Sequence, residues 1–275
     1  KTVYYAPLAV NTERLKRMFE NEDAVKSQAY AGDISFIGSM YNEKHNLYDK
    51  LNGVNDYTKG YLDAIMKAQR SIYGYFFLED MLKGDVLDEM LRVCPVKPNK
   101  DGVETVQYVY ANYFLARRMA TDERTDIMSR IGRELGVKNK INLYTPDSAV
   151  KFINVNNRGT VDYYNEMPYV FRNSRINLNI TLRSIKSGIP LRCMDVCGAG
   201  GFLLSNYQED LYDVFVPGED MVIYDSIDDL MNKCKYYLSH DAERRQIAQN
   251  GFGKIEERHT YDIRFEEIFD VVFNG

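Results

Sequence analysis

Hydrophobic residues recur at every second position over residues 176–180, which is the spacing of a β-strand. Short apolar stretches predict four more strands, over residues 32–40, 141–144, 202–204 and 221–224. Before, between and after these strands, apolar residues recur at the three- and four-residue steps of a helix. We expect helices at 12–20, 161–171, 190–198, 226–238, 241–250 and after 260. This alternation predicts an α/β fold with a Rossmann-like parallel sheet.

Residues from about 54 to 130 carry a different pattern, in which apolar residues recur at steps of three and four. Examples are Tyr57, Tyr61, Ile65, Ala68 and Ile72. A loop containing Pro95 and Pro98 interrupts the series. So many helices exceed an ordinary crossover between two strands. We therefore expect an all-helical insertion after the first strand, packed as a small subdomain at one edge of the sheet.

The composition of this 275-residue chain argues against several classes of protein. Its net charge of -5 disfavours a general nucleic-acid-binding surface. No apolar run reaches the roughly 18 residues of a transmembrane segment, and the first residues lack the apolar core of a signal peptide. Four cysteines are too few for a disulfide scaffold, and none has companions at zinc spacing. The sequence predicts a cytoplasmic protein without a metal site.

The segment from Ser174 to Tyr207 carries the candidate chemistry. It is expected to form a strand, a Gly-Ile-Pro turn, a short helix, a glycine corner and a second strand. Arg192 and Asp195 lie three residues apart on that helix and so share one face. In α/β proteins, a helix that starts beside a glycine turn offers backbone N–H groups to phosphate, and a carboxylate accepts ribose hydroxyls. The segment therefore predicts a nucleotide site.

Asn179 and Thr181 follow the strand, at the carboxyl end where open α/β sheets bind ligands. Each of these four residues also has a purely structural interpretation. Asp195 can cap or salt-bridge a helix, and Arg192 can pair with Asp195 or Glu219. Asn179 and Thr181 can simply satisfy a turn.

Several segments resemble the glycosyltransferase-like domain of the spore-maturation CgeB/YkvP proteins, a bacterial branch of the GT-B glycosyltransferases. The resemblance is carried by residues 33–39, 166–168, 174–207 and 241–267. It covers roughly residues 3–50 and 125–272, and the helical block between them matches no family that we can name. Residues 5–11 look like the hinge between the two GT-B domains. The resemblance thus implies that residues 1–31 are hinge and linker from a missing N-terminal domain, and that residues 32–275 form the donor-binding domain.

The resemblance also implies the chemistry. A nucleotide-sugar donor would bind at the carboxyl ends of the strands, with Asp195 on the ribose and Arg192 on the diphosphate. Gly38 and Ser39 match the loop that approaches the diphosphate, and Gly200 and Gly201 fall where the group places small residues near the nucleotide. The implied function is transfer of a sugar to a surface or spore-associated glycan or protein. No metal or other cofactor is implied.

One departure from the family concerns catalysis. Many retaining members carry a second carboxylate eight residues before the ribose-binding one, and this chain has Ser187 there. The domain therefore lacks an obvious catalytic acid or base, and inverting members draw theirs from the first domain. We expect the isolated chain to bind a nucleoside diphosphate without turning over a donor.

Two alternatives come from other classes of function. The first is a non-catalytic module that binds a nucleotide sugar or a protein, with the helical insertion as its working surface. The second is a methyltransferase, because Asp195 precedes a glycine-rich stretch. In that class glycines follow the acid by two, four and six residues, whereas here they follow by three, five and six.

Overall fold

The computed structural model describes residues 3–21, 24–42, 46–100 and 102–274. The chain divides into two compact units. The first unit comprises Lys1–Gly38, Ile131–Thr181 and Ser187–Gly275. The second comprises Ser39–Arg130 and Leu182–Lys186.

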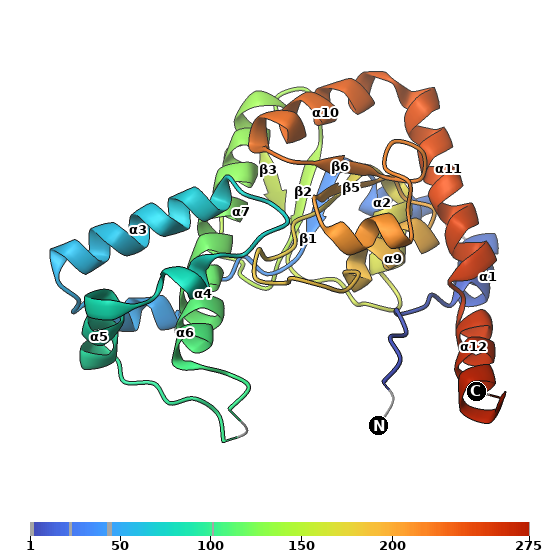
Figure 1. Cartoon of the computed structure of the whole chain (residues 1–275). Helices are drawn as coiled ribbons and strands as arrows, with labels where there is room; N and C mark the ends of the chain where they lie inside the picture. The colour runs from blue at the N-terminus through green and yellow to red at the C-terminus, as the bar shows by residue number, and fades with distance from the viewer. Residues whose placement is uncertain (1–2, 22–23, 43–45, 101, 275) are drawn as a thin grey trace. The chain divides into compact units, whose positions relative to one another are not determined.

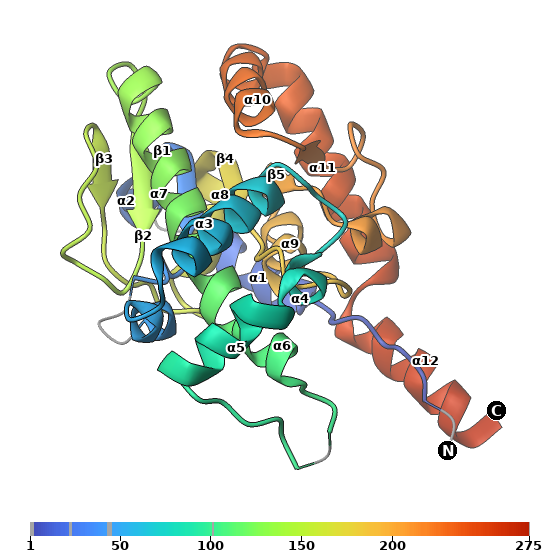
Figure 2. The ribbon, with the colours of Figure 1, turned by 60° about the vertical axis from the view of Figure 1, so that its left-hand side comes forward.

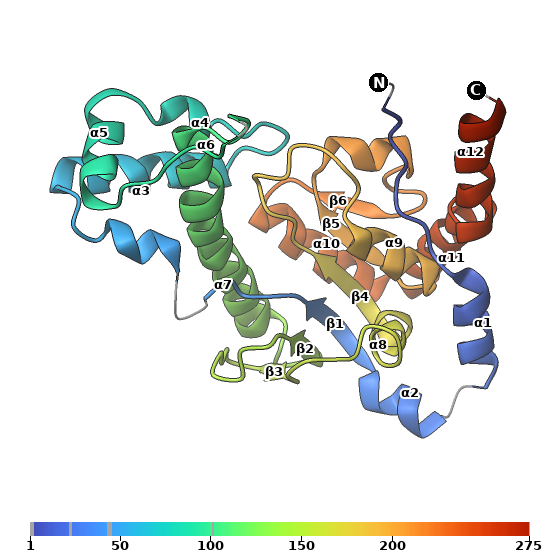
Figure 3. The same cartoon turned by 90° about the horizontal axis from the view of Figure 1, so that it is seen from below.

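The first unit is built on a six-stranded parallel sheet, which confirms the predicted α/β fold. Its strands are β1 (Gly32–Ile37), β2 (Ile141–Tyr144), β3 (Val155–Asn157), β4 (Ser174–Asn179), β5 (Leu203–Asn206) and β6 (Val222–Tyr224). Their order is β3-β2-β1-β4-β5-β6, so the winding reverses between β1 and β4, which lie side by side (Figure 3). In such Rossmann-like sheets, ligands bind outside the carboxyl ends of the strands at this reversal.

Helices cover both faces of this sheet. They are α1 (Thr12–Glu20), α2 (Ala24–Tyr30), α8 (Met167–Asn173), α9 (Leu191–Gly198), α10 (Ile227–Ser239), α11 (Asp241–Arg258) and α12 (Tyr261–Asn274). The sheet lies between α10 and α9 (Figure 1). The buried face of α9 packs on α11 and on β5, with Cys193, Met194 and Cys197 in this core. This packing fixes which side of α9 remains for a ligand.

Helices and helical turns are the regular secondary structure of the second unit in its described residues, and loops connect them. It contains a 3₁₀ turn (Leu47–Leu51), α3 (Asp56–Arg70), α4 (Leu78–Met81), α5 (Gly84–Val93), α6 (Val106–Val109), a π-helical turn (Tyr110–Leu115) and most of α7 (Ala116–Glu134). α3 contacts α4 and α5 (Figure 2), and the unit has a core of its own that includes Leu62, Met90 and Tyr110. The insertion expected over about 54–130 falls within this unit.

The segment that enters the second unit is bonded to the helix by which the chain leaves it. The hydroxyl of Thr121 on α7 donates a hydrogen bond to the carbonyl oxygen of Tyr41 at 2.7 Å. The guanidinium of Arg124 donates to the carbonyl oxygen of Ser39 and lies over the Tyr41 ring, 4.6 Å from its centroid. The two ends of the unit are therefore tied together.

The helix expected over residues 161–171 is wrong in its bounds. α8 starts only at Met167, and Pro168 lies in its first turn, where proline costs no backbone hydrogen bond. Before it, the Asp162 carboxylate accepts hydrogen bonds from the backbone N–H groups of Tyr164 (3.1 Å) and Asn165 (2.7 Å). Aspartate side chains favour this kind of turn, which here replaces the helical conformation expected before Met167.

The end expected for the helix at 241–250 is also wrong. α11 continues through Gly251 to Arg258. A Cβ atom at Gly251 would lie 2.4 Å from the Asp220 carbonyl oxygen and 3.4 Å from the Cys197 sulfur. The glycine therefore permits close packing against its neighbours and does not terminate the helix.

Candidate functional site

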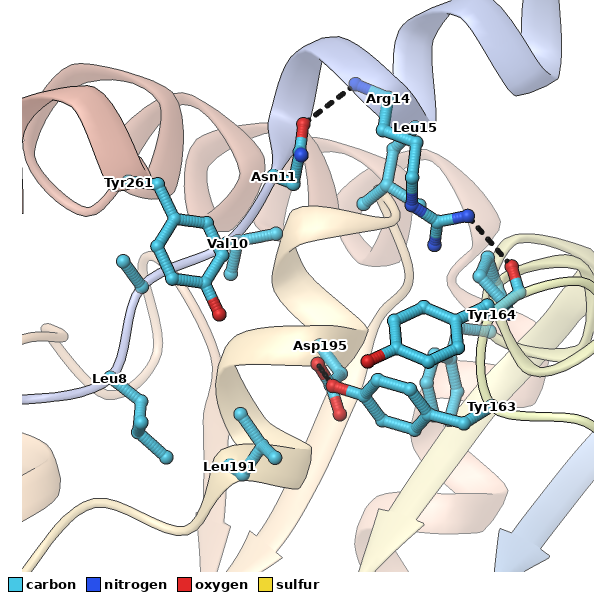
Figure 4. A pocket seen from close by; sticks show the side chains of 13 residues that line it. Leu8, Val10, Asn11, Arg14, Leu15, Tyr163, Tyr164, Leu191, Asp195 and Tyr261 are labelled. Carbon is cyan, nitrogen blue, oxygen red and sulfur yellow. Dashed lines mark hydrogen bonds between the residues drawn. The ribbon is translucent and has the colours of Figure 1, made fainter.

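Asp195 lines a cavity of about 270 Å³ in the first unit (Figure 4). It projects from α9 together with Leu191, one turn earlier, because the other side of this helix is buried in the core. The opposite walls are aromatic: Tyr163 and Tyr164 come from the loop before α8, and Tyr261 starts α12. A carboxylate among aromatic rings suits a ligand with both hydroxyl groups and an apolar face.

The Tyr163 hydroxyl donates a hydrogen bond to Oδ1 of Asp195 at 2.9 Å. Burial raises the pKa of Asp195, while this hydrogen bond and the charge of Arg192 act in the opposite direction. Burial and the nearby carboxylate also raise the pKa of Tyr163, so the phenol keeps its proton. Within the described residues, no group donates to Oδ2 of Asp195. The second carboxylate oxygen can therefore accept a hydrogen bond from a ligand.

The N-terminal segment and α1 supply a further wall of the cavity. Asn11 caps α1 by accepting a hydrogen bond from the backbone N–H of Arg14 at 2.9 Å. The Arg14 guanidinium donates to the Tyr164 carbonyl oxygen at 2.9 Å and lies 5.5 Å from the centroid of its ring. Val10 donates its backbone N–H to the His259 carbonyl oxygen at 2.9 Å. Residues 8–15 are thus held against the rest of the first unit.

Arg192 lies beside this cavity but does not line it. Its guanidinium contacts the sulfur of Met167 and lies 5.3 Å from the centroid of the Phe171 ring. Burial lowers the pKa of Arg192. In the part of the chain that the structure describes, no carboxylate lies within 4 Å of its guanidinium, so the structural alternative, an ion pair with Asp195 or Glu219, is not formed. A partly buried cation without such a partner can accept an anion.

Asn179 and Thr181 lie at the carboxyl end of β4, but both are buried. The Asn179 amide donates to the hydroxyls of Thr181 (2.8 Å) and Ser205 (2.9 Å). The Thr181 backbone N–H donates to the side-chain oxygen of Asn206 at 2.8 Å. These contacts correspond to the structural interpretation of the two residues.

Gly38 and Ser39 follow β1, and the structure places them in different units. Gly38 donates its N–H to the Tyr144 carbonyl oxygen at 3.0 Å, which extends the pairing of β1 with β2. The Ser39 hydroxyl accepts a hydrogen bond from the backbone N–H of Tyr41 at 2.9 Å. Neither residue lines the Asp195 cavity.

Gly200 and Gly201 lie after α9, where the chain enters β5 at the amino edge of the sheet. Gly200 adopts a φ of 75°, a conformation that favours glycine. A Cβ atom at Gly201 would lie 2.6 Å from the Phe171 carbonyl oxygen and 2.8 Å from Nδ2 of Asn177. The structure therefore does not bring these glycines to the Asp195 cavity, and Gly201 serves close packing.

Gly201→Ala should lower the free energy of unfolding by about 1–3 kcal/mol, because the added methyl group is overpacked against the Phe171 backbone. Gly253→Ala is the matched control, because Gly253 lies within α11 and the added Cβ would have no heavy atom within 4 Å apart from the backbone of its own helix. This substitution should raise the free energy of unfolding by about 0.5–1 kcal/mol. Urea unfolding of both variants measures the difference. A Gly201→Ala protein of normal stability would remove this structural role.

A family comparison decides the class of the chain. Residues 124–270, more than half of the sequence, match the family model for glycosyl transferase-like proteins. The chain belongs to the glycosyl transferase-like family. A search of curated proteins finds no match.

Solved structures with the same fold include a trehalose-6-phosphate synthase, OtsA, at a TM-score of 0.50 and 13% identity. The alignment covers 98% of this chain and 50% of OtsA. A glycosyltransferase from Rickettsia africae ESF-5 gives a TM-score of 0.47 and 8% identity over 98% of this chain and 57% of that one. The glycosyl transferase-like chain thus spans about half the length of these proteins. At such identities the likeness shows the fold alone, which is of the GT-B type.

Of the eight donor-binding residues predicted for this glycosyl transferase-like chain, Asp195 alone lines the cavity. Sequence reasoning missed Tyr163, Arg14 and Tyr261, which converge on it from distant positions. One signal in the sequence could have indicated this wall of the cavity: the adjacent tyrosines 163 and 164 come just before residues 166–168, which carry part of the family resemblance. The methyltransferase alternative is wrong, because Asp195 lies within a helix and not at the end of a strand.

In the described ranges, no three His, Cys, Asp or Glu side chains of the glycosyl transferase-like chain form a group that could hold a metal ion. No helix among the same residues is long and apolar enough to cross a membrane.

Proposed function

We propose that this chain is the donor-binding half of a glycosyltransferase that uses a nucleotide-activated sugar without a metal ion. The observation that supports this best is the Asp195 carboxylate, which lies in an aromatic cavity with one oxygen bonded to Tyr163. Family membership supports glycosyl transfer in general. The nucleoside would occupy the cavity, with its ribose hydroxyls on Asp195 and its base against the ring of Tyr163 or Tyr164.

The diphosphate would extend from the ribose toward Arg192, which follows the Gly-Ile-Pro turn at the start of α9. A guanidinium can pair with two phosphate oxygens at once. Phe171 and Met167 contact Arg192 and exclude water from one side of it. The proposed acceptor is a surface or spore-associated glycan or protein, and this rests on the resemblance to the CgeB/YkvP branch.

The resemblance to the GT-B group implies that another domain supplies the catalytic acid or base. Ser187 replaces the second carboxylate of retaining relatives, and its side chain is exposed. The same substitution supports the alternative of a non-catalytic module that binds nucleotide sugars or proteins. Turnover of a nucleotide sugar by the intact polypeptide would separate the two, because only a transferase consumes the donor.

Titration of the purified chain with UDP, GDP, ADP, CDP and the matching nucleosides should reveal one preferred nucleoside diphosphate. Arg192→Ala should weaken binding of that diphosphate at least tenfold and leave the affinity for the nucleoside nearly unchanged, because only a phosphate contact is lost. Arg258→Gln, an exposed substitution on α11, controls for the loss of one positive charge. No binding by any nucleotide, or efficient multiple turnover by the 275-residue chain alone, would contradict the proposal.

A further inference from the structure

Four arginines line a second cavity in the first unit, at the amino edge of the sheet, and one of them is Arg172 of α8. Arg175 is the second residue of β4, and Arg244 and Arg245 lie in the first turns of α11. The cavity measures about 420 Å³, and its other described polar lining includes neutral Asn173, Ser174 and Gln249. No aspartate or glutamate is among the described residues that line it. A cavity with this lining is unusual in a chain whose net charge is -5.

One carboxylate, Asp241, pairs with three of these guanidinium groups, those of Arg175, Arg244 and Arg245. Asp241 lies 3.7 Å from Arg175 and 2.7 Å from Nε of Arg245, and it also pairs with Arg244. These arginines lower the pKa of Asp241, so it remains a carboxylate. Asp33 adds a second negative charge, 3.2 Å from Arg175. Two carboxylates therefore face three guanidinium groups, and positive charge is left in excess.

The innermost arginine has an unused donor. Arg244 is 7% exposed, and its Nε is buried without a hydrogen-bond partner among the described residues. Its Nη1 donates to the Arg175 carbonyl oxygen at 3.0 Å, while Arg175 donates to the Leu238 carbonyl oxygen at 2.6 Å. These bonds hold both guanidinium groups in place before any ligand arrives. A buried donor left unpaired costs free energy, which an acceptor entering the cavity would recover.

We infer that this cavity is a phosphate-binding site, separate from the nucleotide cavity. The two cavities share no lining residue: Pro168 and Phe171 of α8 line the first, whereas Arg172 and Asn173 at the end of α8 line the second. Ligands of Rossmann-like sheets bind at the carboxyl edge, so the amino edge is not occupied by the donor. A phosphate group matches three guanidinium groups because it offers three acceptor oxygens and accepts paired hydrogen bonds from arginine.

The phosphate can belong to a dissolved phosphate compound or to the headgroup of a phosphorylated lipid, which present the same chemistry to the arginines. The cavity accommodates a phosphate together with part of the group that carries it. The inference does not depend on the proposed function, because Asp195 and Arg192 take no part in it.

The test is calorimetric titration with inorganic pyrophosphate, compared between the wild-type chain and Arg245→Gln. The Arg245 side chain is 74% exposed, so its replacement should leave the melting temperature unchanged. We expect Arg245→Gln to bind pyrophosphate at least tenfold more weakly, and Arg258→Gln, an exposed change on the same helix, to bind it as the wild type does. Arg244→Lys should also weaken binding, because lysine keeps the charge and loses the paired donors.

A second arm identifies the source of the phosphate. Vesicles of phosphatidylcholine with phosphatidic acid are sedimented with each variant, and vesicles of phosphatidylcholine alone are the control. If the protein sediments with the vesicles, and this depends on phosphatidic acid and on Arg245, the site binds a lipid headgroup. If the protein binds pyrophosphate but does not sediment with the vesicles, the site binds a dissolved compound. Absence of both, or equal pyrophosphate binding in wild type and Arg245→Gln, would overturn the inference. Because the comparison is made through Arg245, a failure of the nucleotide site would leave it unaffected.

Discussion

Asp195→Asn should weaken binding of the preferred nucleoside diphosphate by about 1.5–3 kcal/mol, or roughly one to two decades in dissociation constant. Asparagine keeps the shape of the side chain but removes the charge-assisted hydrogen bonds to the ribose hydroxyls. The cavity and the Tyr163 contact are otherwise preserved. Calorimetry on both proteins gives the two dissociation constants directly.

The same substitution should not destabilise the fold. Burial raises the pKa of Asp195 above its ordinary value of 3.8, so the folded chain favours the protonated carboxyl. That contribution to stability is present at low pH and is lost as pH rises through the raised pKa. Asparagine cannot ionise, so the melting temperature at neutral pH should be equal to or higher than that of the wild type. Nucleotide affinity should have the opposite pH dependence, increasing as Asp195 ionises.

Asp262→Asn provides the matched control, because Asp262 is exposed and does not line the cavity. It should leave both nucleotide affinity and its pH dependence unchanged. Equal affinity in wild type and Asp195→Asn would assign Asp195 a structural role. An affinity loss accompanied by a large fall in melting temperature would lead to the same conclusion.

Glu123→Gln should lower the free energy of unfolding of the second unit by about 3–5 kcal/mol, the usual cost of breaking a buried ion pair. Glu123 and Arg183 are 2.6 Å apart, and each side chain is 4% exposed. The Arg183 guanidinium also lies over the Tyr73 ring, 3.2 Å from its centroid, and donates to the Arg70 carbonyl oxygen. Among the residues that the structure describes, none bonds its Nε or Nη1, so without Glu123 a buried charge would remain uncompensated.

Asp122→Asn, at the neighbouring position on α7, is the control for loss of an exposed ion pair. The Arg118–Asp122 pair is 41% and 36% exposed, so its loss should cost no more than about 1 kcal/mol. The double variant Glu123→Leu with Arg183→Met should recover much of the stability, because it removes both buried charges. Urea unfolding, followed by hydrogen exchange of the α3 and α7 amides, reports on this unit. Similar small losses in Glu123→Gln and Asp122→Asn would contradict a buried pair.

The strands were predictable where the sequence alternates or forms a short apolar run, because burial imposes that pattern. β4 and β2 were located in this way. β3 was not, because its three residues, Val155–Asn157, are too few and too polar to show a period. The start of α8 was misplaced because the turn at Asp162 was not recognised, and the end of α11 was misplaced because Gly251 was interpreted from local preference alone. Tertiary packing decides whether a glycine ends a helix or admits a close neighbour.

The candidate site was predictable only along one helix. The spacing of Arg192 and Asp195 places them on one turn, but it cannot show that Arg192 turns toward Phe171 while Asp195 enters a cavity. Tyr163 bonds Asp195, and Arg14 lines the same cavity, both from distant positions in the sequence, so no local pattern contains this information. Adjacent arginines on a polar helix, such as Arg244 and Arg245, favour a solvated helix face when only the sequence is considered. Their convergence with Arg175 on Asp241 depends on contacts between α11 and a residue of β4 that is more than 60 positions earlier.

The bonds that tie the ends of the second unit together have a consequence for folding kinetics. The central strand β1 pairs with partners more than 100 residues later, Ile34 with Ile141 and Gly32 with Ser174. Closing so long a loop in an unfolded chain is entropically costly and slow. The second unit contains mostly local helical contacts, and once Thr121 and Arg124 have bonded to Tyr41 and Ser39, the two ends of its main segment are already adjacent. The insertion thereby converts the pairing of β1 with β2 from a remote encounter into a nearly local one.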